Sequence, residues 1–109
     1  MATSTIKYDG DTSWHNGTTT QSAPIKYRLR NGVCYITAEY SGQLTINDTP
    51  STVMTLPEGY RPSTQIYGTL INRASSGGGV VYINPNGTVV LRSSAATAYF
   101  DFTVAYPVN

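Results

Sequence analysis

Residues 25–40, IKYRLRNGVCYITAEY, decide the fold class, because apolar and polar residues alternate on both sides of Asn31-Gly32. Alternation with a period of two is typical of a half-buried β-strand. Asn-Gly accepts the positive backbone dihedrals of a two-residue hairpin turn, which fixes the register of the two strands. The expected register pairs Arg30 with Val33, Leu29 with Cys34, Arg28 with Tyr35, Tyr27 with Ile36 and Lys26 with Thr37.

The two faces of this hairpin differ in polarity. One face, expected to join the core, carries Ile25, Tyr27, Leu29, Cys34, Ile36 and Ala38. The other, expected to face water, carries Lys26, Arg28, Arg30, Tyr35 and Glu39. The basic row on this second face has two interpretations: a solvated face that protects a sheet edge, or a contact for the phosphates of a surface polysaccharide.

A second hairpin is predicted around Asn84-Pro85-Asn86-Gly87, where Pro suits a type I turn and Gly the left-handed residue after it. The three-residue loop places Val81 and Ile83 beside Leu91 and Val89, and leaves Val80, Tyr82 and Val90 on the opposite face. Both faces are therefore apolar. We expect this hairpin to be central in a sandwich or covered by another subunit.

The remaining strands are expected over 53–56, 65–73 and 98–108, and no long stretch shows a helical period. Residues 57–63 form a loop with two prolines, and 74–79 a glycine-serine loop. Residues 1–20 are Thr-rich and poorly periodic, so we expect an N-terminal arm or connector, followed by one β-domain over 21–109.

Composition excludes several classes of protein. A chain of 109 residues fits one domain, and a net charge of +1 argues against nucleic acid as a partner. We expect neither membrane insertion nor a signal peptide, because no long apolar run is present. Cys34, the one cysteine, lies in an apolar strand and is expected to be buried and unreactive.

Catalytic chemistry is not indicated by the residues available. The chain has one His, one Cys and six carboxylates, and none forms a recognisable catalytic or metal-binding pattern. A polysaccharide hydrolase would need a pair of positioned carboxylates. We therefore expect no enzyme activity, no metal and no cofactor.

Several motifs together resemble a known family. They are Trp14, YRLRNGV at 27–33, TLPEGYRPS at 55–63, VYIN at 81–84, NGTV at 86–89 and YPV at 106–108. In order and spacing the chain resembles the C-terminal receptor-binding tip, or head, domain of tail fibre and baseplate proteins from phages that infect Gram-positive bacteria. The 55–63 motif is the most specific.

The resemblance implies an antiparallel β-sandwich or barrel, jelly-roll-like, that forms a homotrimer at the phage tail tip. It implies attachment to a host cell-wall saccharide and contact with other tail or baseplate proteins. Members usually carry long N-terminal shafts, so the chain is expected to be an excised domain or a short variant. The alternative is a structural trimerisation or capping module without a ligand.

Saccharide sites combine an aromatic platform with planar polar side chains. The candidate ligand-binding residues of these types are Trp14, His15, Tyr99, Asp101 and Arg61. Trp14 and His15 rank first because the segment around them offers little core to join. Asp101 follows because a carboxylate between two phenylalanines must face away from the core. The expected ligand is a glycerol-phosphate or sugar-phosphate polymer, or a neutral polysaccharide.

Overall fold

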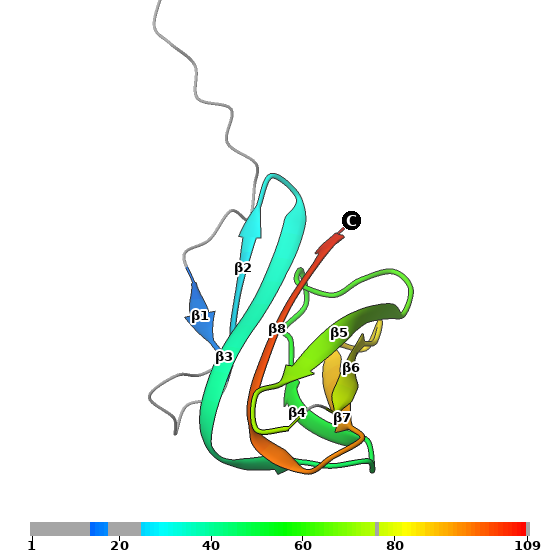
Figure 1. The fold of residues 1–109 in the computed structure, drawn as a ribbon. Coiled ribbons are helices and arrows are strands. Elements are labelled where there is room, and N and C mark those ends of the chain that lie inside the picture. The colour runs from blue at the N-terminus through cyan, green and yellow to red at the C-terminus, as the bar shows by residue number, and fades with distance from the viewer. Residues whose placement is uncertain (1–13, 18–24, 76, 109) are drawn as a thin grey trace, which may run out of the picture.

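The computed structural model describes residues 14–17, 25–75 and 77–108, and these form one antiparallel sheet of eight strands (Figure 1). The strands are β1 (His15–Asn16), β2 (Lys26–Arg30), β3 (Val33–Ile46), β4 (Ser51–Thr55), β5 (Ile66–Asn72), β6 (Gly78–Ile83), β7 (Thr88–Ser93) and β8 (Thr97–Pro107). Their order across the sheet is β1-β2-β3-β8-β5-β6-β7-β4. The predicted all-β antiparallel class is confirmed.

The sheet curls on itself into a half-barrel (Figure 1). Its concave face is the core, to which alternate residues of β2, β3, β5, β6, β7 and β8 contribute. At the centre, Tyr40 of β3 stacks on Phe100 of β8 with ring centroids 4.7 Å apart, and both rings are buried. The convex face carries the alternate residues of each strand whose side chains point away from the core. We call it the outer face.

The hairpin at Asn31-Gly32 forms as predicted, with every one of the five expected residue pairs in register. Asn31 and Gly32 both have positive φ, 54° and 75°, as the turn requires. The expected core face is also confirmed, except that Tyr27 is half-buried and packs against the core from its edge. Ile25, Cys34 and Ile36 are fully buried, and Leu29 and Ala38 nearly so.

The second hairpin also has the expected register, with Val81 opposite Leu91 and Ile83 opposite Val89. Gly87 has a φ of 92°, and its N–H donates to the Asn84 carbonyl across the turn at 2.8 Å. The hairpin lies inside the sheet between β5 and β4. Its outer-face residues Val80, Tyr82 and Val90 are half-buried in the single chain.

Several strand boundaries differ from the predicted ones. The glycine-serine loop was expected over 74–79, but β6 already begins at Gly78, because Gly78 and Gly79 pair with Ile71 and Leu70 of β5. β3 continues beyond residue 40 to Ile46, past an irregularity that shifts its register against β8. Tight packing explains Gly79 in a strand: a Cβ there would lie 2.2 Å from the Arg92 carbonyl oxygen.

The expected arm over 1–20 lies mostly outside the described residues. Its described part, 14–17, includes β1, which pairs with β2 through His15 and Tyr27. No helix in the described ranges is long and apolar enough to cross a membrane.

Cys34 is buried, as predicted. Burial raises the pKa of its thiol, while a hydrogen bond with Tyr106 opposes that rise. The thiol therefore stays protonated at neutral pH, which makes it a poor nucleophile.

Candidate ligand-binding cleft

A shallow cleft lies on the outer face beside the Asn31-Gly32 turn. Its volume is about 330 Å³, and it is lined by Trp14, Arg28, Arg30, Asn31 and Tyr35. Alternation along β2 places Arg28 and Arg30 on the same face. Cross-strand pairing then brings Tyr35 opposite Arg28. The residue before β1 adds Trp14, the chain's one tryptophan.

Trp14 and Arg28 contact each other in this cleft. The guanidinium carbon of Arg28 lies 5.3 Å from the centroid of the Trp14 ring, within the range of a cation–π interaction. The indole remains 44% exposed, so much of its surface is available to a ligand. Nε of Arg28 is buried and has no hydrogen-bond partner among the described residues. Buried donors are nearly always paired, so this N–H calls for an acceptor from outside the described residues.

The cleft is positively charged. None of the described residues that line it is acidic, and the ion pairs of the described residues join Arg73 to Asp101 and Arg92 to Asp48. Arg28 and Arg30 are thus left without a carboxylate partner in the described part of the chain. An aromatic platform beside two planar cations can stack on a sugar ring and donate several hydrogen bonds to anionic oxygens.

His15 lies on the opposite face of β1 and does not line the cleft. Its ring packs against Tyr27 at 5.3 Å and edge-on against Tyr60 at 5.9 Å, and Nε2 lies 3.2 Å from the Tyr60 hydroxyl. Tyr27 and Tyr60 are in edge contact at 5.0 Å. Burial, with a smaller contribution from Tyr60, raises the pKa of Tyr27. We call His15, Tyr27 and Tyr60 the aromatic clasp, because it links β1 to the diproline loop that carries Tyr60.

The aromatic clasp is expected to position Trp14, since β1 has only two residues paired with β2. Tyr60→Ala should release His15 and raise the accessibility of Trp14, whereas Tyr60→Phe, which keeps the ring contacts, should change it less. Acrylamide quenching of fluorescence measures this at one site, because Trp14 is the one tryptophan. Tyr67→Ala, at an exposed ring on β5, is the control. Equal quenching in Tyr60→Ala and the parent would contradict the positioning role.

Asp101 and Tyr99 lie on the outer face of β8, away from the cleft. Asp101 is four residues along β8 from Ala105, which pairs with Tyr35, so the separation along the strand is about 13 Å. Arg73, the residue directly after β5, forms an ion pair with Asp101 at 3.0 Å and also donates to the Tyr40 carbonyl at 2.5 Å. The carboxylate therefore has its partner within the chain and ties β8 to β5. Tyr99 is 48% exposed beside it.

Arg61 has a bracing position in the diproline loop. Its Nε donates to the Leu56 carbonyl at 2.8 Å. The side chain also covers Gly87, where a Cβ would lie 2.6 Å from that same Nε. Of the candidate residues, the structure thus places Trp14 in the cleft, His15 and Arg61 at other positions, and Tyr99 with Asp101 as a separate pair.

The sequence prediction did not include Arg28, Arg30, Asn31 and Tyr35 in the site. The basic row was recognised, and the predicted register already paired Arg28 with Tyr35. The missing information was the position of Trp14, because nothing in the sequence indicates where a two-residue strand pairs. The described residues contain no group of three or more His, Cys, Asp or Glu that could hold a metal ion.

Comparisons with known proteins give a match in structure but none in sequence. No family model and no curated protein matches the chain. Among solved structures, the chain is similar to the crystal structure of the head domain of phage bIL170, described with the receptor-binding domains of lactococcal phages. The TM-score is 0.66 at 15% sequence identity, over 91% of this chain and all of that domain.

This similarity confirms the fold that the motif resemblance implied. Agreement over the full length of the bIL170 head domain shows that the chain has a phage head-domain fold. The fold alone does not define the function, because one fold can carry different functions.

Proposed function

We propose that this chain is a receptor-binding domain at the tip of a phage tail, and that it attaches the virion to a saccharide on the host cell surface. The fold supports this role. The observation that carries the proposal is the open cleft in which an exposed Trp14 lies against Arg28.

The charge of the cleft favours a phosphate-bearing saccharide over a neutral one. Arg28 and Arg30 have no carboxylate partner in the described chain, and Nε of Arg28 is buried without an acceptor. A phosphodiester group would supply acceptor oxygens to both guanidinium groups, while the attached sugar or polyol stacks on Trp14. Glycerol-phosphate and sugar-phosphate polymers share this chemistry.

The proposal includes a homotrimer that joins other tail or baseplate proteins. The outer face of β5, β6 and β7 supports self-association. Tyr67 and Ile71 are 63% and 56% exposed there, and the half-buried Tyr82 lies against Tyr67 at 5.3 Å. Apolar side chains on the outer face of a central hairpin gain burial if another copy covers them. If each copy binds weakly, three copies that bind together would also raise the overall binding strength through avidity, by about 10²–10⁴-fold.

Binding to host cell walls tests the proposed cleft. Trp14→Ala and Arg28→Ala should each weaken adsorption of the chain by about 10- to 100-fold, because each removes a stacking surface or a charge-assisted donor worth about 1.5–3 kcal/mol. Adsorption of the parent should also weaken as salt is raised, since the cleft is cationic. Thr103→Ala, at an exposed position on β8, is the matched control.

The outcomes separate the candidates once each variant is shown to keep the parent's oligomeric state. If both cleft variants bind like the parent while Asp101→Ala loses binding, the site is on β8 instead. If the parent binds no candidate cell wall, the chain is a structural module and the proposed function is wrong.

A further inference from the structure

Lys26 continues the basic row of β2 beyond the Trp14 cleft. Lys26, Arg28 and Arg30 alternate with residues that pack on the core, so their side chains lie on the outer face. Arg28 and Arg30 line the cleft, whereas Lys26 is exposed outside it. Residues two apart on a strand are separated by about 7 Å along its axis, so the row extends over about 13 Å.

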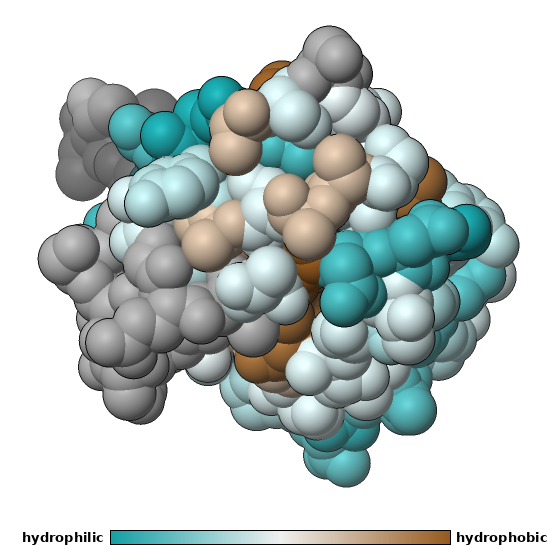
Figure 2. Space-filling view, turned by 60° about the horizontal axis from the view of Figure 1, so that its bottom comes forward, coloured by the Kyte–Doolittle hydropathy of each residue, from teal (hydrophilic) through white to brown (hydrophobic). Residues whose placement is uncertain are grey.

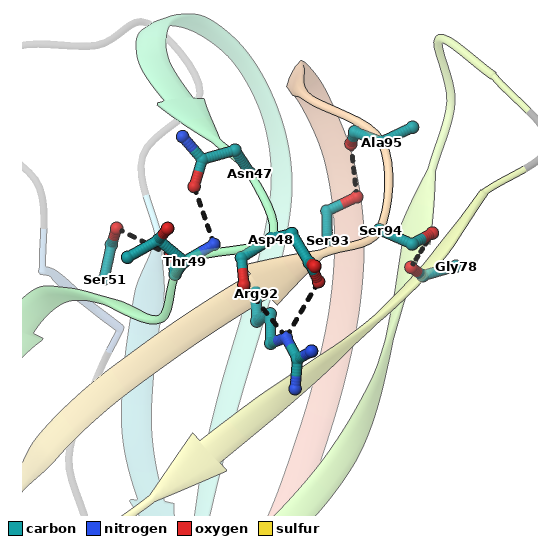
Figure 3. A network of polar contacts seen from close by, with 9 residues as sticks. All are labelled: Asn47, Asp48, Thr49, Ser51, Gly78, Arg92, Ser93, Ser94 and Ala95. Carbon is teal, nitrogen blue, oxygen red and sulfur yellow. Dashed lines mark hydrogen bonds and ion pairs between the residues drawn. The ribbon is translucent and has the colours of Figure 1, made fainter.

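No ion pair compensates the row within the described part of the chain. Its cross-strand partners on β3 are all uncharged, namely Thr37, Tyr35 and Val33. Figure 3 shows a contrasting cation on the outer face, Arg92, whose guanidinium lies 3.0 Å from the Asp48 carboxylate. Like charges along one strand repel each other, so the row lacks the negative charge that would balance it.

A polar surface alone does not single out the row. Figure 2 shows that the end of the molecule away from the Asn31-Gly32 turn is also mostly polar or neutral, with strongly hydrophobic side chains only in narrow gaps. Protection of a sheet edge does not explain Lys26 either, because Asn16 of β1 pairs with it and covers that edge of β2. The distinguishing feature is a run of positive charges without ion pairs that begins in the cleft.

We propose that Lys26 binds the second phosphate of a polymer whose first phosphate occupies the Trp14 cleft. The inference rests on the proposed function, and it deepens that function by defining the ligand as a chain of phosphodiesters that runs along β2. Six single bonds separate the phosphorus atoms on either side of a three-carbon polyol, as many as the backbone bonds of two residues, so an extended repeat also spans about 7 Å. The flexible stem of Lys26 brings a compact ammonium group to that phosphate.

The row ends at an acidic residue. Glu39 of β3 is exposed on the outer face, two residues beyond Thr37, the cross-strand partner of Lys26. Glu39 is therefore the diagonal neighbour of Lys26, about 7–8 Å away between backbone positions. Its carboxylate repels a phosphate that extends past Lys26. The row thus favours two successive phosphates and disfavours a third.

Binding of two small phosphodiesters tests this second site. Methyl propyl phosphate carries one phosphodiester, and propane-1,3-diyl bis(methyl phosphate) carries two, separated by a three-carbon spacer. Nitrogen–proton correlation spectra of the full chain, titrated with each probe at physiological salt, give both dissociation constants from amide shifts beside the cleft. The two-phosphate probe should bind about four- to tenfold tighter, because either of its phosphates can enter the cleft and the other gains an exposed charge pair with Lys26.

Substitutions along the row assign this difference to Lys26. Lys26→Gln should reduce it to about twofold, the statistical advantage of two phosphates, and change the affinity of the single-phosphate probe by less than about twofold. Lys26→Arg, which keeps the charge, should preserve the difference. Glu39→Gln should increase it by about twofold, since a nearby negative charge is removed. Arg92→Gln is the matched control, because it removes one positive charge from β7, outside the row.

The possible results separate this inference from the proposed function. A difference of about twofold or less in the parent, one that survives Lys26→Gln, or one that is equally lost in Arg92→Gln would overturn the second site. If the single-phosphate probe still binds, the proposed function stands without it. If neither probe binds, the inference also fails, and adsorption of the parent to cell walls then shows whether the proposed function fails with it.

Discussion

Replacement of Phe100 by alanine is expected to lower the free energy of unfolding by about 3–5 kcal/mol. Phe100 is fully buried, stacks on Tyr40 at 4.7 Å and lies parallel to Phe102 at 6.3 Å. It pairs with Tyr40 of β3 and Asn72 of β5, at the junction of the two halves of the sheet. Removing the ring leaves a cavity lined by residues from three strands, and a curled sheet cannot close around it without breaking register.

Chemical and thermal unfolding of the Phe100→Ala variant measure this loss. A domain of this size has a total stability of about 5–15 kcal/mol, so the melting temperature should fall by more than about 10 °C. Tyr99→Ala is the matched control, because it removes an aromatic ring from the next position of β8, where the side chain is 48% exposed. A loss below about 1 kcal/mol in Phe100→Ala would show that the core at this junction can repack.

Local elements of the fold could be predicted from the sequence because short-range chemistry determines them. Asn31-Gly32 fixes one hairpin and Asn84-Pro85-Asn86-Gly87 the other, and in both the turn sets the register of every pair that follows. Alternation along 98–108 likewise gave the buried face of β8. These features depend on residues within about 15 positions of one another. Over that distance, the backbone dihedral preferences of the turn residues and the two-residue alternation of strand side chains determine the structure.

Long-range pairing could not be predicted in the same way. β8 lies between β3 and β5, and β4 pairs with β7, yet no turn links either pair. Strands in which apolar and polar residues alternate are compatible with many strand orders in a sheet, since each strand needs only a buried face and a neighbouring strand. The partner of Asp101 shows the consequence. The sequence indicated that this carboxylate needs a counterpart, but Arg73 reaches it because β5 pairs with β8 at that point.

The candidate cleft was predictable only in part for the same reason. Arg28 and Tyr35 belong to one hairpin, and their pairing followed from the turn. Trp14 joins them through the two-residue strand β1, whose position depends on contacts of His15 with Tyr27 and Tyr60. Tyr60 comes from a loop 45 residues away in sequence. The sequence therefore indicated that Trp14 could serve as an aromatic platform. It did not indicate that Arg28 and Tyr35 lie beside Trp14, because the aromatic clasp sets that position.

Tyr82→Asp is expected to dissociate the proposed homotrimer at micromolar concentration. Tyr82 is half-buried at the centre of the outer face of β6, opposite Val90 and in edge contact with the exposed Tyr67. If another copy covers this face, the substitution buries an unpaired charge at a cost of about 3–5 kcal/mol per copy, which corresponds to a weakening of at least about 100-fold for each interface.

Sedimentation velocity of the parent and the variants measures the oligomeric state directly. Arg92 is on the same outer face and its pKa is raised in part by Tyr82, so it could partly neutralise an aspartate at position 82. Tyr82→Lys removes this compensation and should dissociate the trimer at least as strongly. Thr103→Asp, on the outer face of β8, introduces the same charge outside the proposed interface and should leave the trimer intact. A monomeric parent would refute the homotrimer, whereas a trimer that survives both Tyr82 variants would place the interface on a different face of the sheet.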